Sequence, residues 1–159
     1  MRMDQIAYHV PNDGAARMVM NTFGLKEENF TIDYAKGKVW LPHVGWGDME
    51  AKLRFNYDMG IEFELLTYLM IPNCISRCCF REIEDVSLVH FSHIGIHLEE
   101  GEDFPSPECM IMVQEMMTES HTNENVPVGQ TYHYKIFGYK ENVKGPFIKY
   151  IKRIPENDG

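Results

Sequence analysis

Residues able to bind a metal or carry a proton recur at matching places in the two halves of the chain. Gln5 and His9 are followed, 88 residues later, by His93 and His97. Both segments have the pattern polar, isoleucine, small, any residue, histidine, aliphatic. This alternation of apolar with polar or small residues is typical of half-buried β-strands. The repetition predicts a duplicated unit, with the leading polar residue of each copy turned inward.

A further predicted strand, over residues 61–69, carries two carboxylates that could take part in binding or catalysis. In the predicted strand over 61–69, Glu62 and Glu64 fall on one face, and Phe63 and Leu65 fall on the other. An unpartnered carboxylate is costly to bury. The pattern therefore indicates either a cation or water beside these groups, or two glutamates on a solvated face.

The remaining segments give both halves the same plan of one strand, one helix and further strands. Asn12 or Asp13 can cap the first helix and Gly24 can end it. The first half is predicted to contain a strand over 3–10, a helix over 15–23, and strands over 30–34, 38–41, 51–57 and 61–69, with 38–41 either continuing 30–34 or pairing with it. The second half is predicted to contain a strand over 91–98, a helix over 106–120, and strands over 131–139 and 147–154.

Two connecting segments have no regular pattern. Residues 42–48 are rich in glycine and contain Trp46, which predicts a loop that is either a lid over a ligand or a packed turn. Residues 71–89 are rich in cysteine and acidic side chains and predict a linker. The expected organisation is a first module over 1–70, this linker, and a second module over 90–159.

Composition narrows the class of function. The 159 residues have a formal net charge of −9, which argues against a nucleic-acid binder because such proteins present a basic face. The sequence has neither a signal-peptide pattern nor an apolar run approaching the ~20 residues of a membrane span. We therefore expect a cytoplasmic protein that does not bind membranes.

The four cysteines do not have the spacing of a zinc site. Cys74, Cys78, Cys79 and Cys109 include no pair separated by two residues, and adjacent cysteines rarely ligate one ion. Buried or loop thiols are the expected state in a reducing compartment.

The βαβββ plan with these strand openings resembles the vicinal oxygen chelate superfamily, also called the glyoxalase/bleomycin-resistance fold. Four segments carry the resemblance: 4–10 (DQIAYHV), 61–66 (IEFELL), 92–98 (SHIGIHL) and 145–151 (GPFIKYI). The resemblance implies an α+β fold in which two βαβββ modules pair into an open, half-barrel-like sheet. It also implies pairing either within one chain or across a homodimer.

The resemblance further implies a divalent metal site inside the sheet. Position by position, its ligands correspond to Gln5, Glu64 and His93, and the fourth position, usually glutamate, is Lys149. Amide oxygen, carboxylate and imidazole suit Zn, Ni, Fe or Mn. An ammonium at Lys149 repels a metal, and it can accept a proton only if the metal lowers its pKa.

Two functions are consistent with this resemblance, and a third is independent of it. One is a metal-dependent lyase, isomerase or dioxygenase acting on a small oxygenated substrate, with Lys149 as a base or an anion-binding group. Another is a metal-free protein that binds or sequesters a small molecule, as the family's antibiotic-binding members do. The third is a protein-interaction role, for which Trp46 is a candidate contact.

Overall fold

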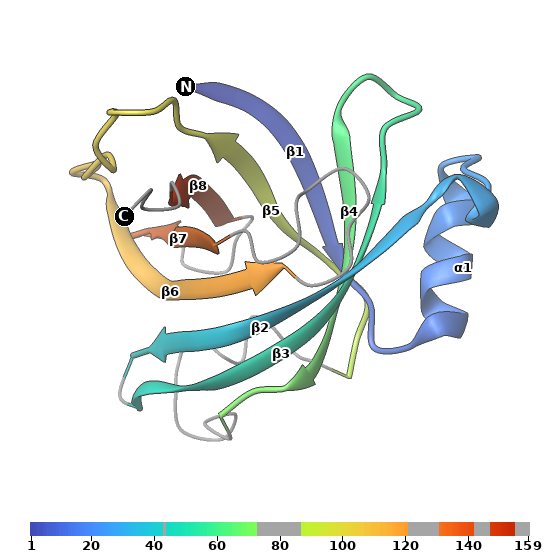
Figure 1. Cartoon of the computed structure of the whole chain (residues 1–159), viewed down its shortest axis with the longest axis horizontal. Helices are drawn as coiled ribbons and strands as arrows, with labels where there is room; N and C mark the ends of the chain where they lie inside the picture. Colours follow the sequence, from blue (N-terminus) through green and yellow to red (C-terminus); the bar gives the residue numbers. More distant parts are fainter. Residues whose placement is uncertain (43, 73–86, 121–130, 142–146, 155–159) are drawn as a thin grey trace, which may run out of the picture.

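Eight strands close into a barrel within the part of the chain that the computed structural model describes, which is residues 1–42, 44–72, 87–120, 131–141 and 147–154. One α-helix lies outside this barrel (Figure 1). The strands are β1 (Arg2–His9), β2 (Thr31–Leu41), β3 (Gly45–Asn56), β4 (Glu62–Met70), β5 (His90–His97), β6 (Met110–Ser120), β7 (Thr131–Tyr139) and β8 (Phe147–Ile154), and the helix α1 spans Asp13–Thr22.

The two halves of the chain contribute the same order of strands to the barrel. The first half runs β1-β4-β3-β2 and the second runs β5-β8-β7-β6. In each half the first strand pairs in parallel with the last, and the other neighbours are antiparallel. Antiparallel β1–β5 and β2–β6 pairings join the halves and close the barrel, so every strand has two neighbours.

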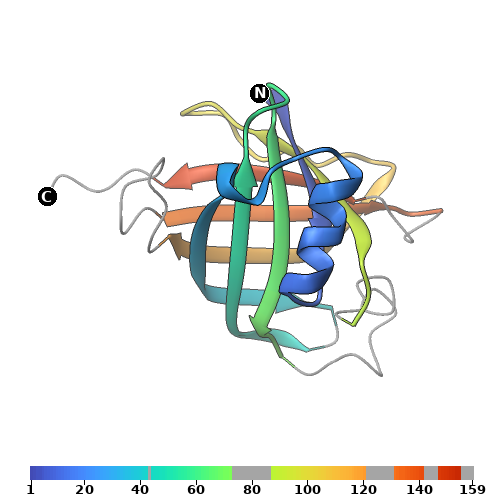
Figure 2. The same ribbon diagram turned by 90° about the vertical axis from the view of Figure 1, so that its right-hand side faces the viewer.

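Helix α1 forms where the sequence predicts it, for the predicted reasons. The Asn12 side chain caps it by accepting a hydrogen bond from the Ala15 backbone N–H. Gly24 follows with a φ of 66°, a conformation that a residue with a Cβ rarely adopts. The helix buries Ala16, Val19 and Met20 against the outer face of β1 and β4 (Figure 2).

The interior of the barrel has an apolar part and a polar part. Side chains from β2, β3, β4, β6, β7 and β8 fill the apolar part, among them Val39, Leu53, Met116 and Phe147. Interior positions of β1 and β5 instead carry buried polar residues, and β2, β4, β6 and β8 each add at least one to the polar part. Side chains normally fill the interior of a small barrel. A polar part of that interior is therefore the first place to look for a ligand-binding site.

The expected fold class was wrong in two respects. The sheet is closed and mostly antiparallel rather than an open half-barrel, and the described part of the second half has no helix. The two βαβββ modules of an α+β fold are therefore not what the chain forms. A segment that includes Leu98 and Phe104 takes the place of a helix, packing against the outer face of β5–β8.

The predicted helix over 106–120 is strand β6, and a β-bulge explains the error. The register shifts between Met112 and Gln114. Met112 therefore packs in the outer cluster, whereas Val113 and Met116 pack in the interior. A strand that changes which face is inward loses its period of two, and its apolar residues then imitate helical spacing.

Of two smaller predictions, one is confirmed and one changes. The segment 38–41 continues the preceding strand, as one of the two alternatives had it, and together they form β2 from Thr31 to Leu41. The predicted loop over 42–48 is shorter, since β3 begins at Gly45 and Trp46 pairs with Trp40 across the β2–β3 hairpin. Trp46 is exposed. Most of the predicted linker, residues 73–86, lies outside the described residues.

The β2–β6 closure depends on a residue without a side chain at position 37. A Cβ on Gly37 would come within 2.8 Å of Thr118 Cα and would collide with the Met117 carbonyl group. These are backbone atoms of the neighbouring strand, so the collision cannot be relieved by a rotamer change. Close approach at this position is what lets the two halves join.

We therefore expect Gly37→Ala to lower the free energy of unfolding by about 1–3 kcal/mol, the range for overpacked interiors. Urea denaturation followed by tryptophan fluorescence measures it. Gly14→Ala in the first turn of α1 is the matched control, because its nearest added contact is an ordinary 3.4 Å. Equal stability of Gly37→Ala and wild type would show that the strands separate at no cost.

Candidate functional site

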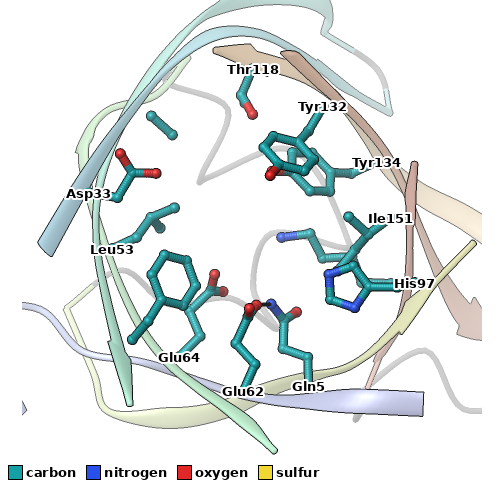
Figure 3. Close-up of a pocket in the computed structure, with 13 residues that line it drawn as sticks. Gln5, Asp33, Leu53, Glu62, Glu64, His97, Thr118, Tyr132, Tyr134 and Ile151 are labelled. Carbon is teal, nitrogen blue, oxygen red and sulfur yellow. Dashed lines mark hydrogen bonds between the residues drawn. The ribbon is translucent and has the colours of Figure 1, made fainter. Parts of the chain in front are cut away.

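A cavity opens at the polar end of the barrel interior. The empty space there, counted together with open solvent at the mouth, is about 480 Å³. Figure 3 shows carboxylate and amide groups reaching in from one side and two tyrosines from the opposite side. The lining residues are Gln5, Asp33, Ala35, Leu53, Phe55, Glu62, Glu64, His97, Thr118, Tyr132, Tyr134, Lys149 and Ile151.

All four residues that the resemblance selected are buried, and the structure brings its three predicted metal ligands together. Gln5, Glu64, His93 and Lys149 are at most 5% exposed. The His93 Nε2 lies 2.9 Å from Gln5 Oε1 and 3.6 Å from Glu64 Oε1. Gln5, Glu64 and Lys149 line the cavity, and His93 lies beside it.

The small residues of the repeated strand motif explain how two large polar side chains meet. In the β1–β5 pair, Gln5 is opposite Gly95 and Ala7 is opposite His93. A Cβ on Gly95 would lie within 2.8 Å of Gln5 Cδ. Each strand thus provides the space that the polar side chain of the other strand occupies.

The same register makes Lys149 the counterpart of Glu64. Ala7 pairs in parallel with Glu64 on β4, and Gly95 pairs in parallel with Lys149 on β8. Glu64 and Lys149 therefore hold equivalent positions in the two halves, one carrying an acid and the other a base. The assignment of Lys149 to the place of a second glutamate rests on the resemblance and stays a prediction.

A chain of hydrogen bonds fixes Gln5 and His93. Tyr57 and the Gln5 amide both donate to Glu62, and the Gln5 carbonyl oxygen accepts from His93 Nε2. Because an amide oxygen only accepts, the proton of the neutral ring is on Nε2, and Nδ1 accepts from the Ser92 hydroxyl. Burial, with a smaller effect from the Lys149 charge, holds the pKa of His93 well below its usual value. The imidazole is thus neutral at pH 7.

Glu64 differs from its neighbours because its Oε1 has no hydrogen-bond partner. The residue is only 2% exposed. Burial raises the pKa of Glu64 to about 6, and the Lys149 charge opposes this while Glu62 adds to it. A carboxylate in this position is destabilising until something in the cavity donates to it.

Lys149 contributes a buried cation to the same space. Its Nζ lies 4.2 Å from the centroid of the Tyr134 ring, within the range of a cation–π contact. Burial, and to a lesser extent Glu64, raises the pKa of Tyr134, although Thr118 opposes this by a hydrogen bond. The phenol is therefore neutral and can take part only through its hydroxyl or its ring face.

The predicted ligands fit a divalent metal in type and spacing. Donors about 2.0–2.2 Å from a common ion lie roughly 3 Å or more from each other, and the separations of 2.9 and 3.6 Å suit this. The unpartnered Glu64 oxygen is ready to coordinate, whereas His93 would first have to lose the proton on Nε2 and its hydrogen bond to Gln5. Lys149 weakens the fit by its charge. No group of three or more His, Cys, Asp or Glu residues able to hold a metal occurs in the described part of the chain.

Several lining residues were not predicted as part of a site. Asp33 on β2, Thr118 on β6, and Tyr132 and Tyr134 on β7 all face the cavity. The alternation in β2 and β7 could have identified a shared face for Asp33 and Ala35, and for Tyr132 and Tyr134. It could not show that this face is inside a closed barrel.

Other singled-out residues have structural surroundings. His9 is buried, its Nδ1 2.9 Å from the Leu88 carbonyl oxygen, and its ring stacks on His90. His133 contacts Glu115 and is not among the residues that line the cavity, whereas His97 is.

The cysteine prediction can be assessed at one position. Cys109 is a free, exposed thiol, and Cys74, Cys78 and Cys79 lie outside the described residues.

Comparisons with known proteins add no relative. No family model matches the chain, and no curated protein or solved structure matches it. Among the described residues, no helix is both long and apolar enough to cross a membrane. Any function must therefore be argued from the cavity.

We expect Glu64→Gln to stabilise the protein in a pH-dependent way. The folded protein holds the Glu64 proton more tightly than the unfolded chain does, so wild type gains stability below the unfolded pKa and loses it as pH rises through about 6. At about pH 8, the variant should be more stable by roughly 2 kcal/mol, from 1.36 kcal/mol per pKa unit.

Urea unfolding of both proteins near pH 4 and pH 8 measures this difference, which should nearly vanish at the lower pH. Glu119→Gln, at an exposed position of β6, is the control and should show neither effect. The same difference in stability at both pH values would mean that ionisation of the buried Glu64 carboxyl does not lower the stability of the wild-type protein.

Proposed function

We propose that the protein binds a small polar molecule inside the barrel, at the polar end lined by Glu64, Lys149 and Tyr134. One observation carries this proposal: a carboxylate that is 2% exposed has an oxygen without a hydrogen-bond partner at the wall of a cavity. Stability alone would favour an apolar or amide side chain here. A group that lowers stability while facing a cavity is a candidate for ligand recognition.

The surroundings of Glu64 support binding of an ordered ligand. Gln5 and His93 are held by hydrogen bonds that run from Tyr57 to Ser92, so the polar wall is organised before a ligand arrives. Preorganised donors and acceptors reduce the entropy lost on binding. Apolar side chains beside Glu64, such as its cross-strand neighbour Phe55 and Leu53, supply a contact surface.

This function corresponds to the metal-free interpretation of the resemblance to the vicinal oxygen chelate superfamily, and that kinship itself stays a proposal. The buried Lys149 ammonium favours the metal-free form because it repels a doubly charged ion more strongly than a singly charged or neutral molecule. A divalent ion would have to overcome this charge.

A metal-dependent enzyme is the second candidate, and the meeting of three predicted donors favours it. Gln5, Glu64 and His93 would hold the ion, which would polarise oxygen atoms of a substrate. Lys149 would then stabilise negative charge on that substrate or, if deprotonated, act as a base. Zn, Ni, Fe and Mn are all compatible with this set of donors.

Metal analysis decides between the two candidates. We expect protein purified without chelator to contain less than stoichiometric Zn, Ni, Fe or Mn, and its melting temperature to stay unchanged when each ion is added. His93→Ala, measured beside it, should show the same low content. A stoichiometric metal in wild type that is lost in His93→Ala would establish the second candidate in place of the first.

Ligand binding is tested separately by screening small polar fragments while observing side-chain NMR signals of Tyr132 and Tyr134. We expect binders to shift these signals and to raise the melting temperature, as any ligand specific for the folded state does. Glu64→Gln should weaken the binders, and Glu119→Gln should not. If no fragment of a broad set perturbs the tyrosine signals, the proposed function fails.

A further inference from the structure

The charges that line the cavity are unequal. Glu62 and Glu64 supply two carboxylates and Asp33 supplies a third that has a partner of its own, whereas Lys149 supplies the one lysine ammonium of the lining. The lining also includes His97, but its Nδ1 contacts the Asp4 carboxylate, which offsets any charge on the ring. Arg153 is exposed and is not part of the lining. The walls therefore carry an excess of negative charge.

The tyrosines opposite these carboxylates experience the same field. Burial is the main reason that the pKa of Tyr132 is raised, and Glu62 and Asp33 raise it further against the opposing charge of Arg153. Glu64 and Glu62 act in the same direction on Tyr134. The carboxylates of β4 thus act on the tyrosines of β7, that of β2 acts on Tyr132, and Arg153 opposes them at Tyr132.

The opposite wall is aromatic and already contacts an ammonium. The rings of Tyr132 and Tyr134 are stacked, with centroids 6.0 Å apart. Lys149 Nζ lies over the Tyr134 ring at 4.2 Å. The side chain of this lysine shows how an alkylammonium is accommodated here, on an aromatic face in a negatively charged pocket.

We infer that the molecule bound by this barrel is an organic cation, a small compound with a protonated amine that meets the unpartnered Glu64 oxygen and the ring faces of Tyr132 and Tyr134. This inference rests on the proposed function and specifies its ligand class. The ammonium would supply the N–H donor that Glu64 Oε1 lacks, and its apolar part would contact Phe55 and Leu53.

An anionic ligand is a poorer match. Lys149 is the one lining lysine that could pair with it, and the three carboxylates would repel it in a water-poor space. A neutral ligand would satisfy Glu64 but would gain nothing from the negative field. Charge therefore discriminates among molecules of the same shape.

The test uses matched probes that differ in one group: benzylammonium, benzyl alcohol and benzoate, with n-butylammonium, n-butanol and butyrate as a second series. Binding is measured by NMR titration of Tyr132 and Tyr134 side-chain signals near neutral pH, at constant ionic strength. We expect each ammonium to bind about tenfold or more tightly than its alcohol, as for hydrogen bonds to charged groups. The carboxylates should bind weakest.

Two variants assign the effect to the cavity charges. Glu64→Gln should remove most of the preference for ammonium over alcohol, whereas Lys149→Met should strengthen ammonium binding by removing a like charge. Glu119→Gln should change neither. Both variants must first show the NMR dispersion of the wild-type protein, which confirms that they are folded. Glu64→Asp keeps the negative charge and should retain the preference for ammonium over alcohol.

The possible outcomes distinguish failure of the cation inference from failure of the proposed binding function. Alcohols or carboxylates that bind inside the barrel as tightly as ammonium probes would overturn the inference and leave the proposed function standing. Failure of both ammonium probes at millimolar concentration also overturns the inference. The proposed function falls only if the broader fragment set fails as well.

Discussion

The site depends on the pairing between β1 and β5, where each strand makes room for the other. Gln5 crosses over Gly95, and His93 crosses over Ala7. Larger residues at positions 7 and 95 would force the strands apart or push the polar side chains out of the barrel. The 2.9 Å contact between Gln5 and His93 follows from this exchange of small and large residues. The parallel neighbours β4 and β8 then bring Glu64 and Lys149 to the same level of the barrel.

Because the barrel is closed, these polar groups lie away from bulk water, and their effect on stability depends on whether they have hydrogen-bond partners. The apolar cluster fills one part of the interior and leaves the other part to carboxylates, an amide, an imidazole and an ammonium. Most of them have partners: Glu62 accepts two hydrogen bonds, and His93 makes contacts through both ring nitrogens. Glu64 retains an oxygen without one. The lining of the cavity is thus held by hydrogen bonds while Glu64 keeps an acceptor free, which is the arrangement expected of a binding pocket that is formed in advance.

The sequence predicted local structure and the polar residues of the site better than it predicted the architecture. Period-two alternation located β1, β4, β5, β7 and β8, and capping residues located α1. The meeting of Gln5 and His93 was also anticipated, because the repeated motif placed them on equivalent strands, whereas Glu64 was joined to them only by the resemblance. Closure was missed because the β2–β6 pairing is a long-range contact whose one local sign is Gly37. The bulge at Val113 hid β6, and without a closed barrel Asp33, Tyr132 and Tyr134 could not be assigned to the interior.

The equivalence of Glu64 and Lys149 has a consequence for any bound molecule. Two halves with the same strand order create an approximate twofold relation, and a pocket with true twofold symmetry would accept an elongated guest in either of two opposite directions. An acid at one of the related places and a base at the other remove that degeneracy. A guest whose ends differ in polarity would therefore be bound in one direction, with the same atom always presented to the same wall.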